Sequence, residues 1–304
     1  MTDRPRVVAL GGGHGLAVAL RAARRYAGSI TAVVSVADDG GSSGRLRRDL
    51  AVLPPGDLRK CLIALAAPGN VWADAFDYRF TVGDLSGHSL GNLVLAGLAE
   101  TLGDSVAAIN EAARLLGVTG QVRPATTEPV VLKAEVDGAS VEGQVAVMTH
   151  GGRIGRVELV PADAPGDPDA VAAIHAADQV VLAPGSLYTS LLPVLSVDEV
   201  RAAVSATSAQ VVQVCNLRPQ PPETTGLDAA DHLQAVLDHG ARVDVFCYEA
   251  AGDLPVDEAE IRALGVRPVG AHVARDSGLV HDPSRLAQAL ADLLQSRPQQ
   301  EVPA

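Results

Sequence analysis

Short apolar runs alternate with stretches of helical spacing along most of the chain. The runs are nearly continuous and bounded by polar or glycine-rich residues, so they predict buried strands at 7–10, 30–36, 179–183, 211–215 and 243–246. Apolar residues at helical spacing predict a helix after the first run and further helices at 93–102, 105–116, 169–177, 197–206, 230–237 and 284–294. Strands that alternate with helices are typical of a Rossmann-like, doubly wound α/β fold with a mostly parallel sheet.

The hydrophobic period changes between residues 129 and 160. Alternating apolar residues from Val131 to Val136 precede Asp137-Gly138, and valines continue beyond it as far as Val147. Asp-Gly is a preferred dipeptide for a two-residue turn between antiparallel strands. We therefore expect an antiparallel β-hairpin, followed by a short strand at 157–160, inserted into a single domain that spans residues 1–295.

A glycine-rich turn, Gly11 to Gly15, follows the first predicted strand. Glycines at this place let backbone N–H groups approach an anion at the N-terminus of the next helix. Candidate ligand-binding residues are therefore Gly12, Gly13, His14 and Gly15. The turn lacks the GxGxxG spacing of dinucleotide-binding proteins, so a tight turn without a ligand is the alternative.

Acidic, glycine and hydroxyl residues follow the second predicted strand. Asp38 stands where Rossmann-type proteins place an acid that binds a ribose hydroxyl. Asp38 and Asp39 are alternatively a pair that holds a divalent metal together with ligand phosphate, or a helix N-cap in a solvated turn. The diphosphate of a ligand would lie against the residues that come next, which are Gly41, Ser42, Ser43 and Arg45.

Two cations stand in the first turn of the helix that follows Pro54 and Pro55. Asp57 is expected to be the N-cap of this helix. Arg59 and Lys60 oppose the helix dipole, which favours acidic residues in a first turn. Their position indicates an anionic partner, with simple surface exposure as the alternative for Lys60.

Ser86, His88, Ser89 and Asn92 surround glycines at the start of the predicted helix 93–102. Small polar residues at a helix N-terminus are typical of a site for an anion or a sugar. His88 is either a general acid or base, since its unperturbed pKa is near neutrality, or a hydrogen-bonded structural residue.

Two later loops also follow predicted strands. Gly185, Ser186, Tyr188 and Thr189 come after the strand at 179–183, and Asn216 comes after the strand at 211–215. The carboxyl ends of parallel strands share one edge of a sheet, and ligands bind there in the crevice where the strand order reverses. We therefore predict that these loops and those after the first two strands form one nucleotide- or phosphate-binding crevice.

Composition limits the kinds of partner. The 304 residues include 36 acidic and 24 basic side chains, a formal net charge of −12, which argues against nonspecific binding of nucleic acid. Aromatic residues are only 3% of the chain and hydrophobic residues 47%, so we expect a core of Ala, Val and Leu. Cys61, Cys215 and Cys247 have no metal-binding spacing and are expected to be reduced core residues, without structural zinc.

No apolar run reaches the roughly 18 residues of a membrane span, and a short polar lead runs directly into the first strand, without a signal peptide. We therefore expect a cytoplasmic protein without a membrane span. The polar residues 296–304 are expected to form a disordered tail.

Six motifs occur in order between Leu10 and Gly240. They are LGGGHG, VADDGGSSGRLR, PPGDLRKCL, LSGHSLGNLVLAG, APGSLYTSLLP and DHLQAVLDHG. Together they resemble the gluconeogenesis factor branch of the CofD-like family, whose other branch contains 2-phospho-L-lactate transferase. The resemblance implies a Rossmann-like fold, a homodimer and binding of UDP-sugars such as UDP-N-acetylglucosamine. It also implies regulation of cell shape, peptidoglycan synthesis and growth on gluconeogenic carbon sources through an unidentified protein partner, without an established reaction.

The chain departs from this family at two places. His14 replaces the usual threonine of the glycine turn, so a phosphate contact there is lost or becomes dependent on pH. The region after Cys247 is shorter than usual, although the family uses a tyrosine and an arginine in this region for the UDP-sugar. Arg275 and Arg285 are the arginines available for that role, and no tyrosine follows Tyr248.

Three functions remain open from the sequence. The first is a UDP-sugar-binding regulator without catalysis and without a metal. The second is a transferase of a phosphate-linked group, in which Asp39 holds Mg²⁺, Arg45 and Arg59 neutralise phosphate charge and His88 shuttles a proton. The third is a dinucleotide-binding protein. No residue is assigned a catalytic role.

Overall fold

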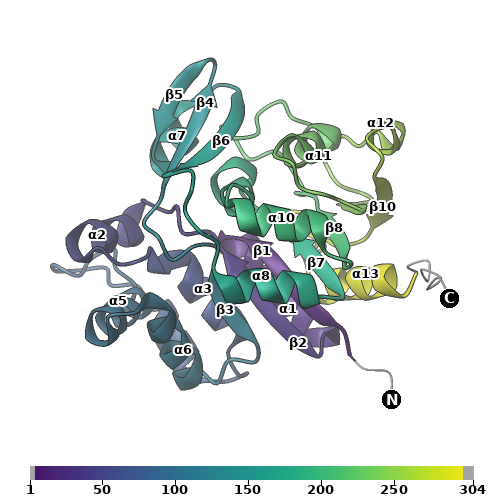
Figure 1. Cartoon of the computed structure of the whole chain (residues 1–304). Coiled ribbons are helices and arrows are strands. Elements are labelled where there is room, and N and C mark those ends of the chain that lie inside the picture. The colour runs from purple at the N-terminus through teal and green to yellow at the C-terminus, as the bar shows by residue number, and fades with distance from the viewer. Residues whose placement is uncertain (1–3, 297–304) are drawn as a thin grey trace.

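The computed structural model describes residues 4–296 of the chain. Its main sheet has seven parallel strands in the order β10-β9-β8-β7-β1-β2-β3 (Figure 1). The strands are β1 (Arg6–Gly11), β2 (Ser29–Val34), β3 (Gln121–Pro124), β7 (Gln179–Leu182), β8 (Gln210–Val214), β9 (Val245–Glu249) and β10 (Arg267–Ala271). All the predicted strands of this sheet are present, and the predicted α/β fold is confirmed.

Helices cover both faces of the sheet (Figure 1). They are α1 (Gly13–Tyr26), α2 (Gly41–Leu50), α3 (Pro55–Leu65), α4 (Val71–Asp77), α5 (Leu90–Leu102), α6 (Ser105–Leu115), α8 (Pro168–Ala176), α9 (Leu192–Leu195), α10 (Asp198–Ala206), α11 (Ala229–Asp238), α12 (Glu258–Ala263) and α13 (Pro283–Gln295), with a π-helix η1 (Leu187–Leu191) before α9. The helix α1 packs against α3 and α13, and α8 packs against α10. The core is mostly Ala, Val and Leu, as composition predicts, and all three cysteines are buried free thiols.

The strand order reverses between β1 and β7. From β1 the chain adds β2 and β3 on one side and then returns to place β7 on the other side. The loop after β7 lies directly on the first turn of α1, because a Cβ atom at Gly15 would overlap the carbonyl oxygen of Pro184. The glycine turn and the loop at 184–190 therefore meet at the reversal point, as the sequence predicts.

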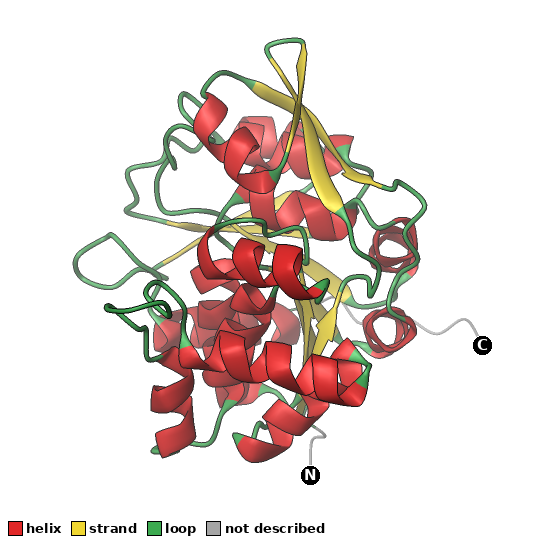
Figure 2. Cartoon of the chain, turned by 90° about the vertical axis from the view of Figure 1, so that its left-hand side faces the viewer, coloured by secondary structure: helices red, strands yellow, loops and turns green. Residues whose placement is uncertain are grey.

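The insertion is a separate three-stranded antiparallel sheet, which stands above the larger body of the molecule in Figure 2. Its strands are β4 (Val131–Val136), β5 (Ala139–Glu142) and β6 (Ile154–Val160), in the order β5-β4-β6. The turn at Asp137 and Gly138 has φ angles of 49° and 80°. Both are positive, as a two-residue hairpin of the predicted kind requires.

The predicted second arm of the hairpin is wrong beyond Glu142. Residues Gln144–His150 form a helix, α7, so Val145 and Val147 are helical. The cause is a distant carboxylate: Asp39 accepts hydrogen bonds from the N–H groups of Gln144 at 3.0 Å and Val145 at 2.9 Å. Such a cap favours a helix, but it comes from a segment about a hundred residues earlier.

Several other local predictions need correction. The predicted loop after the second strand is short, because residues 41–50 form α2, and α5 begins three residues earlier than predicted. Asp57 is not an N-cap, because Pro54 caps α3 and Pro55 occupies its first turn, a position that suits proline. The sequence pattern also missed β3, β10, α4 and α12, which are short. The predicted disordered tail lies outside the described residues except for Ser296, which caps the end of α13.

Within residues 4–296, no helix combines the length and the apolar character that crossing a membrane would require.

Because Gly15 lies so close to the backbone of Pro184, adding one methyl group at this position should lower the stability of the fold. Gly15→Ala should lower the free energy of unfolding by about 1–3 kcal/mol, because the backbone of Pro184 must move to make room. Gly97→Ala in α5 is the matched control, since a Cβ atom there meets nothing within 4 Å and should stabilise the helix by about 0.5–1 kcal/mol. Urea denaturation measures both, and equal stability of the two variants would contradict this packing.

Candidate functional site

The glycine turn forms the amino end of α1, where Gly12 is buried and Gly13 and Gly15 are half-buried. Gly12 occupies the N-cap position, but glycine has no side chain that could accept a hydrogen bond from the first turn. No acidic residue lies in that turn either. His14 is exposed there, and burial and the charge of Lys60 lower its pKa. The first N–H groups of a helix lack partners within the helix and carry partial positive charge. This turn can therefore accept an anion.

Asp57 and Lys60 lie beside the glycine turn. A Cβ atom at Gly12 would be 2.5 Å from Oδ2 of Asp57, and Oδ1 of the same carboxylate pairs with Nζ of Lys60 at 3.0 Å. The sequence analysis took Asp57 for a helix cap and so missed it as a site residue. One signal in the sequence could have identified Asp57. Lys60 is a cation at an unfavourable position in the first turn of α3, and its partner is Asp57.

Asp38 joins the same group of polar side chains. Its Oδ1 accepts a hydrogen bond from the N–H of Gly40 at 3.0 Å, and Ser43 donates to its carboxylate. Ser43 in turn accepts from the N–H of Gly56 at 3.1 Å. Burial, and then the nearby charge of Asp57, raise the pKa of Asp38, while its hydrogen bonds oppose that shift. Both carboxylates therefore lie near the N-terminus of α3, close enough for the charge of Asp57 to affect Asp38.

Asp39 points to the insertion instead. Both of its oxygens accept backbone N–H groups at the start of α7. Asp39 therefore links the main sheet to the inserted sheet, and each of its oxygens is already bonded to a backbone N–H group.

A chain of buried hydrogen bonds joins four predicted ligand-binding residues. Ser42 Oγ and Nδ1 of His88 are 2.9 Å apart, and the same Oγ accepts from the side-chain amide of Asn92 at 2.9 Å. Nε of Arg59 donates to Oδ1 of Asn92 at 3.1 Å. Since Ser42 accepts from Asn92, its own proton is free for a neutral His88. Burial, with the charges of Arg45 and Arg79, lowers the pKa of His88, in keeping with a structural imidazole.

Arg59 is buried and satisfied by protein groups. Its side chain is only 4% exposed, and Nη1 donates to Oδ1 of Asp77 at 2.5 Å and to the carbonyl of Phe76 at 3.3 Å. Arg59 therefore ties α3 to α4 and α5, and the predicted role in neutralising phosphate does not fit this position. The hydroxyl of Ser89 is buried nearby without a hydrogen-bond partner among the described residues.

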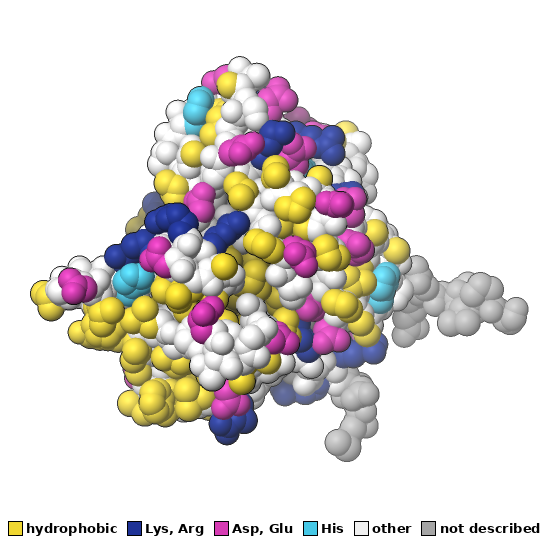
Figure 3. All heavy atoms as spheres, turned by 60° about the vertical axis from the view of Figure 1, so that its left-hand side comes forward, with side chains coloured by type: hydrophobic (Ala, Val, Ile, Leu, Met, Phe, Trp, Pro, Cys, Tyr) yellow, Lys and Arg dark blue, Asp and Glu magenta, His cyan; other side chains and the backbone are white. Residues whose placement is uncertain are grey.

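Arg45 lies nearer to the surface. Its Nη2 donates to the carbonyl of Ser86 at 2.9 Å, which joins α2 to the loop before α5. Arg47 and Arg48 lie in the last turn of the same helix. In Figure 3 basic side chains gather on this face between the inserted sheet and the larger body below it. The local charge is therefore more positive than the net charge of the chain suggests.

The loop at 184–190 already holds a carboxylate of the protein. Oε1 of Glu223 accepts from the N–H groups of Tyr188 at 2.6 Å and Thr189 at 3.1 Å, and Ser186 also bonds to this carboxylate. Burial raises the pKa of Glu223. The sequence predicted a ligand at these residues, and a side chain 34 residues away takes that place. No local signal in the sequence marks Glu223.

Gly185 and Asn216 bind each other. Oδ1 of Asn216 accepts from the N–H of Gly185 at 2.7 Å, and its amide donates to the carbonyl of Gly185 at 2.8 Å. Gly185 has a φ of 126°, a conformation that favours glycine. This pair fixes the loop after β7 to the loop after β8.

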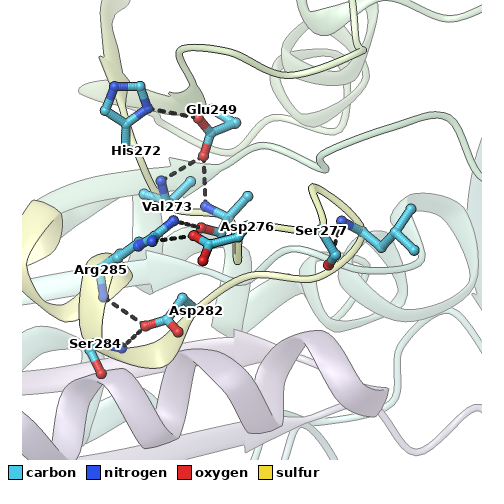
Figure 4. A network of polar contacts seen from close by, with 10 residues as sticks. Glu249, His272, Val273, Asp276, Ser277, Asp282, Ser284 and Arg285 are labelled. Carbon is cyan, nitrogen blue, oxygen red and sulfur yellow. Dashed lines mark hydrogen bonds and ion pairs between the residues drawn. The ribbon is translucent and has the colours of Figure 1, made fainter.

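The two C-terminal arginines differ in their surroundings. Arg285 donates to the carbonyl of Ala274 at 2.6 Å and pairs with Asp276 at 2.5 Å (Figure 4). Close by, the carboxylate of Glu249 accepts from the N–H groups of Val273 and Ala274. Arg285 therefore holds the 273–276 segment in place, while Arg275 is exposed.

A seven-stranded parallel sheet with a glycine turn at its reversal point defines this chain as a Rossmann-like α/β protein. Residues 7–272 match the family model described as 2-phospho-L-lactate transferase CofD. The chain belongs to the CofD family.

Relatives and solved structures agree with this assignment. A protein of Bacillus subtilis named gluconeogenesis factor is 39% identical over 97% of this chain and 99% of its own length. One of Halalkalibacterium halodurans with the same name is 40% identical over 95% of this chain and 96% of its own length. The crystal structure of a UPF0052 family member from Bacillus halodurans superposes with a TM-score of 0.92 at 38% identity, covering 96% of this chain and all of that one.

His281, in the C-terminal segment, predicts how stability depends on pH. Its Nε2 faces the carbonyl of Cys215 at 3.2 Å, and burial lowers its pKa from 6.5 to about 4. Between pH 4 and pH 6.5, His281 is therefore protonated in the unfolded chain and neutral in the folded chain. This contribution to stability is complete above pH 6.5 and is lost, by about 3 kcal/mol, as pH falls to 4.

His281→Gln should reduce the loss of stability between pH 7 and pH 4 by that amount, measured by denaturant unfolding at each pH. His175→Gln, at an exposed position, is the control and should keep the dependence of the parent protein. An unchanged pH dependence of His281→Gln would show that its imidazole is not buried as described.

Proposed function

We propose that this protein binds a UDP-sugar, such as UDP-N-acetylglucosamine, at the carboxyl edge of the main sheet and acts as a cytoplasmic regulator. The main support for the proposal is that several helix N-termini at this edge lack a capping side chain. At that edge α1, α2 and α5 begin without a side-chain cap and without an acid in the first turn. In contrast, an Asn or Asp side chain caps each of α4, α6, α8, α11, α12 and α13. Uncapped N–H groups are what a diphosphate requires.

The ligand groups can be assigned to these residues. The diphosphate would accept hydrogen bonds from the N–H groups of 13–15 and 41–43, and Lys60 would add positive charge beside it. Asp38, whose carboxylate has acceptor capacity beyond Gly40 and Ser43, would bind a hydroxyl of the ribose or the sugar. His14 would lie beside the phosphates in place of the hydroxyl that is usual in the family.

The names of the relatives support the regulatory part of the proposal. Two relatives of about 40% identity over nearly the whole chain are named gluconeogenesis factor. We extend this to a role in growth on gluconeogenic carbon sources, cell shape and peptidoglycan synthesis. Such a regulator needs a protein partner that reads the bound state, and a homodimer is part of the proposal.

Isothermal titration with UDP-N-acetylglucosamine tests the binding directly. We expect a saturable heat, and we expect Asp38→Asn to weaken binding about tenfold or more, because a hydrogen bond to a charged group is worth about 1.5–3 kcal/mol. Asp292→Asn, at an exposed position near the end of α13 and on the opposite edge of the sheet, should bind as the parent does. No heat at millimolar ligand with folded protein would refute the proposal.

A transferase is the second candidate, and the family model and the pair Asp38 and Asp57 favour it. Among the described residues no three His, Cys, Asp or Glu side chains form a metal site. Two carboxylates fit Mg²⁺, which commonly takes its other ligands from phosphate and water. Transfer from a labelled nucleotide-activated donor in the presence of Mg²⁺, abolished by Asp57→Asn, would establish this function instead of regulation alone.

A further inference from the structure

Residues 71–85, which include α4 and the start of the loop after it, place aromatic side chains on the surface. The chain has one Trp, four Tyr and three Phe, and four of these eight residues lie between positions 72 and 80. Phe76 is buried, whereas Trp72 is 46% exposed and Tyr78 is 56% exposed. Trp and Tyr are enriched where proteins bind each other, because each combines a large apolar ring with one polar group.

Aliphatic side chains extend this surface. Among the described residues twelve large hydrophobic side chains are exposed, and five of them belong to residues 71–85. Besides Trp72 and Tyr78 they are Val71, Val82 and Leu85, and Val82 is 80% exposed. Figure 3, which brings the side of α2 and α5 forward, shows hydrophobic side chains gathered below the basic ones. We call these five side chains the 71–85 surface, and such a concentration is typical of an interaction site.

Backbone hydrogen bonds hold this surface in shape. The N–H of Phe80 donates to the carbonyl of His88 at 2.9 Å, and the N–H of Gly87 donates to the carbonyl of Phe80 at 2.8 Å. The rings of Tyr78 and Phe80 pack edge to face, with centroids 5.2 Å apart. The helix α4 is only about 10 Å long, so Trp72 at its start and Tyr78 after its end are within reach of one partner. A surface that is ordered in advance binds at a lower entropy cost.

Charged groups near the 71–85 surface are mostly acidic. Residues 71–104, which form α4, the following loop and α5, contain one arginine and five acidic residues, and all six are exposed. The acidic residues are Asp74, Asp77, Asp84, Glu100 and Asp104. Asp77 pairs with the buried Arg59, and Arg45 of α2 reaches the loop at the carbonyl of Ser86. Apart from this contact with α2, negative charge predominates around the surface.

These charges decide between three possible occupants. A second copy of the chain, in a symmetric dimer, would bring the same acidic residues face to face, and like charges oppose association. The anionic surface of a membrane would be repelled for the same reason. A protein segment with both apolar and basic side chains matches the hydrophobic residues and the acidic ones.

We propose that the 71–85 surface docks a protein segment that presents apolar side chains beside lysine or arginine. The apolar side chains would cover Trp72 and Tyr78, and the basic ones would pair with Asp74 and Asp84 at the rim. The proposed function calls for a protein partner, and this inference gives the partner a place and a chemistry. It does not depend on which ligand the crevice binds.

Trp72 is the single tryptophan of the chain, so tryptophan fluorescence reports on this surface directly. The probe is a synthetic amphipathic helix of Leu and Lys, and the matched peptide has the same Leu residues with Glu in place of Lys. We expect the Leu–Lys peptide to shift the emission of Trp72 to shorter wavelength in a saturable way, at least tenfold more tightly than the Leu–Glu peptide. An equal response to both peptides, or no response to either, would overturn the proposal.

Variants locate the binding on the molecule. Tyr78→Ser should weaken the Leu–Lys peptide about tenfold, as truncation of a central aromatic residue at an interface does, and the highly exposed Val82→Ser should weaken it without disturbing the fold. Leu279→Ser is the control, because Leu279 is also exposed but precedes α13, on the other side of the molecule (Figure 1). Unchanged binding in both Tyr78→Ser and Val82→Ser would overturn the proposal.

A second pair of variants tests the charges. Asp74→Asn combined with Asp84→Asn should weaken the Leu–Lys peptide severalfold. Asp253→Asn combined with Asp292→Asn changes the net charge equally, at exposed positions near α12 and α13, and should leave the affinity unchanged. Equal weakening by the two double variants would show that the peptide responds only to the net charge of the chain, which would overturn the proposal. Circular dichroism verifies that each variant is folded.

The other occupants would give different results. Loss of a dimer in Val82→Ser, measured by sedimentation velocity, would make the surface an interface between copies. A shift of the Trp72 emission with vesicles of phosphatidylcholine and phosphatidylserine would make it a membrane contact. Either result would overturn the proposal. Peptide binding by protein that gives no heat with UDP-N-acetylglucosamine would refute the proposed function alone, and the reverse result would refute this inference alone.

Discussion

The contact between the first turn of α1 and the loop after β7 determines the layout of the molecule. At Gly15 the two backbones approach so closely that a methyl group would overlap the carbonyl of Pro184. Because β1 and β7 begin the two halves of the sheet, this contact sets how the halves meet. The bond between Gly185 and Asn216 extends it to β8. The amino end of α1 is therefore held at the open edge of the sheet with its N–H groups uncapped.

Carboxylates of the protein itself limit where an anion can bind. Asp39 occupies the start of α7, and Glu223 occupies the start of η1. Both are places where helix dipoles and free N–H groups favour negative charge. The starts of α1, α2 and α5 have no side-chain cap, and they are joined through Asp57, Asp38 and the hydrogen bonds of Ser42. This is the region to which we assign the diphosphate in the proposed function, although the chain as a whole is strongly acidic.

Local pattern predicted the parts of this account that depend on local interactions. Five of the seven strands of the main sheet, the glycine turn and the position of Asp38 follow from apolar runs and from residue types at strand ends. The pattern failed where a distant group decides the structure. Asp39 makes 144–150 a helix, and Glu223 fills a predicted ligand site from 34 residues away. The sequence shows that Arg59 and His88 are polar and stand near glycines or a helix start, so they were predicted to bind the ligand. It does not show their hydrogen-bond partners, which come from other helices.

A crystal structure of the protein with UDP-N-acetylglucosamine tests the central claim most directly, which is that the uncapped helix starts at the reversal point hold a diphosphate. The account predicts phosphate oxygens within hydrogen-bond distance of the N–H groups of residues 13–15, with Asp38 on a ligand hydroxyl. A ligand whose phosphates lie elsewhere on the molecule, with the turn at Gly12 unchanged and empty, would contradict it.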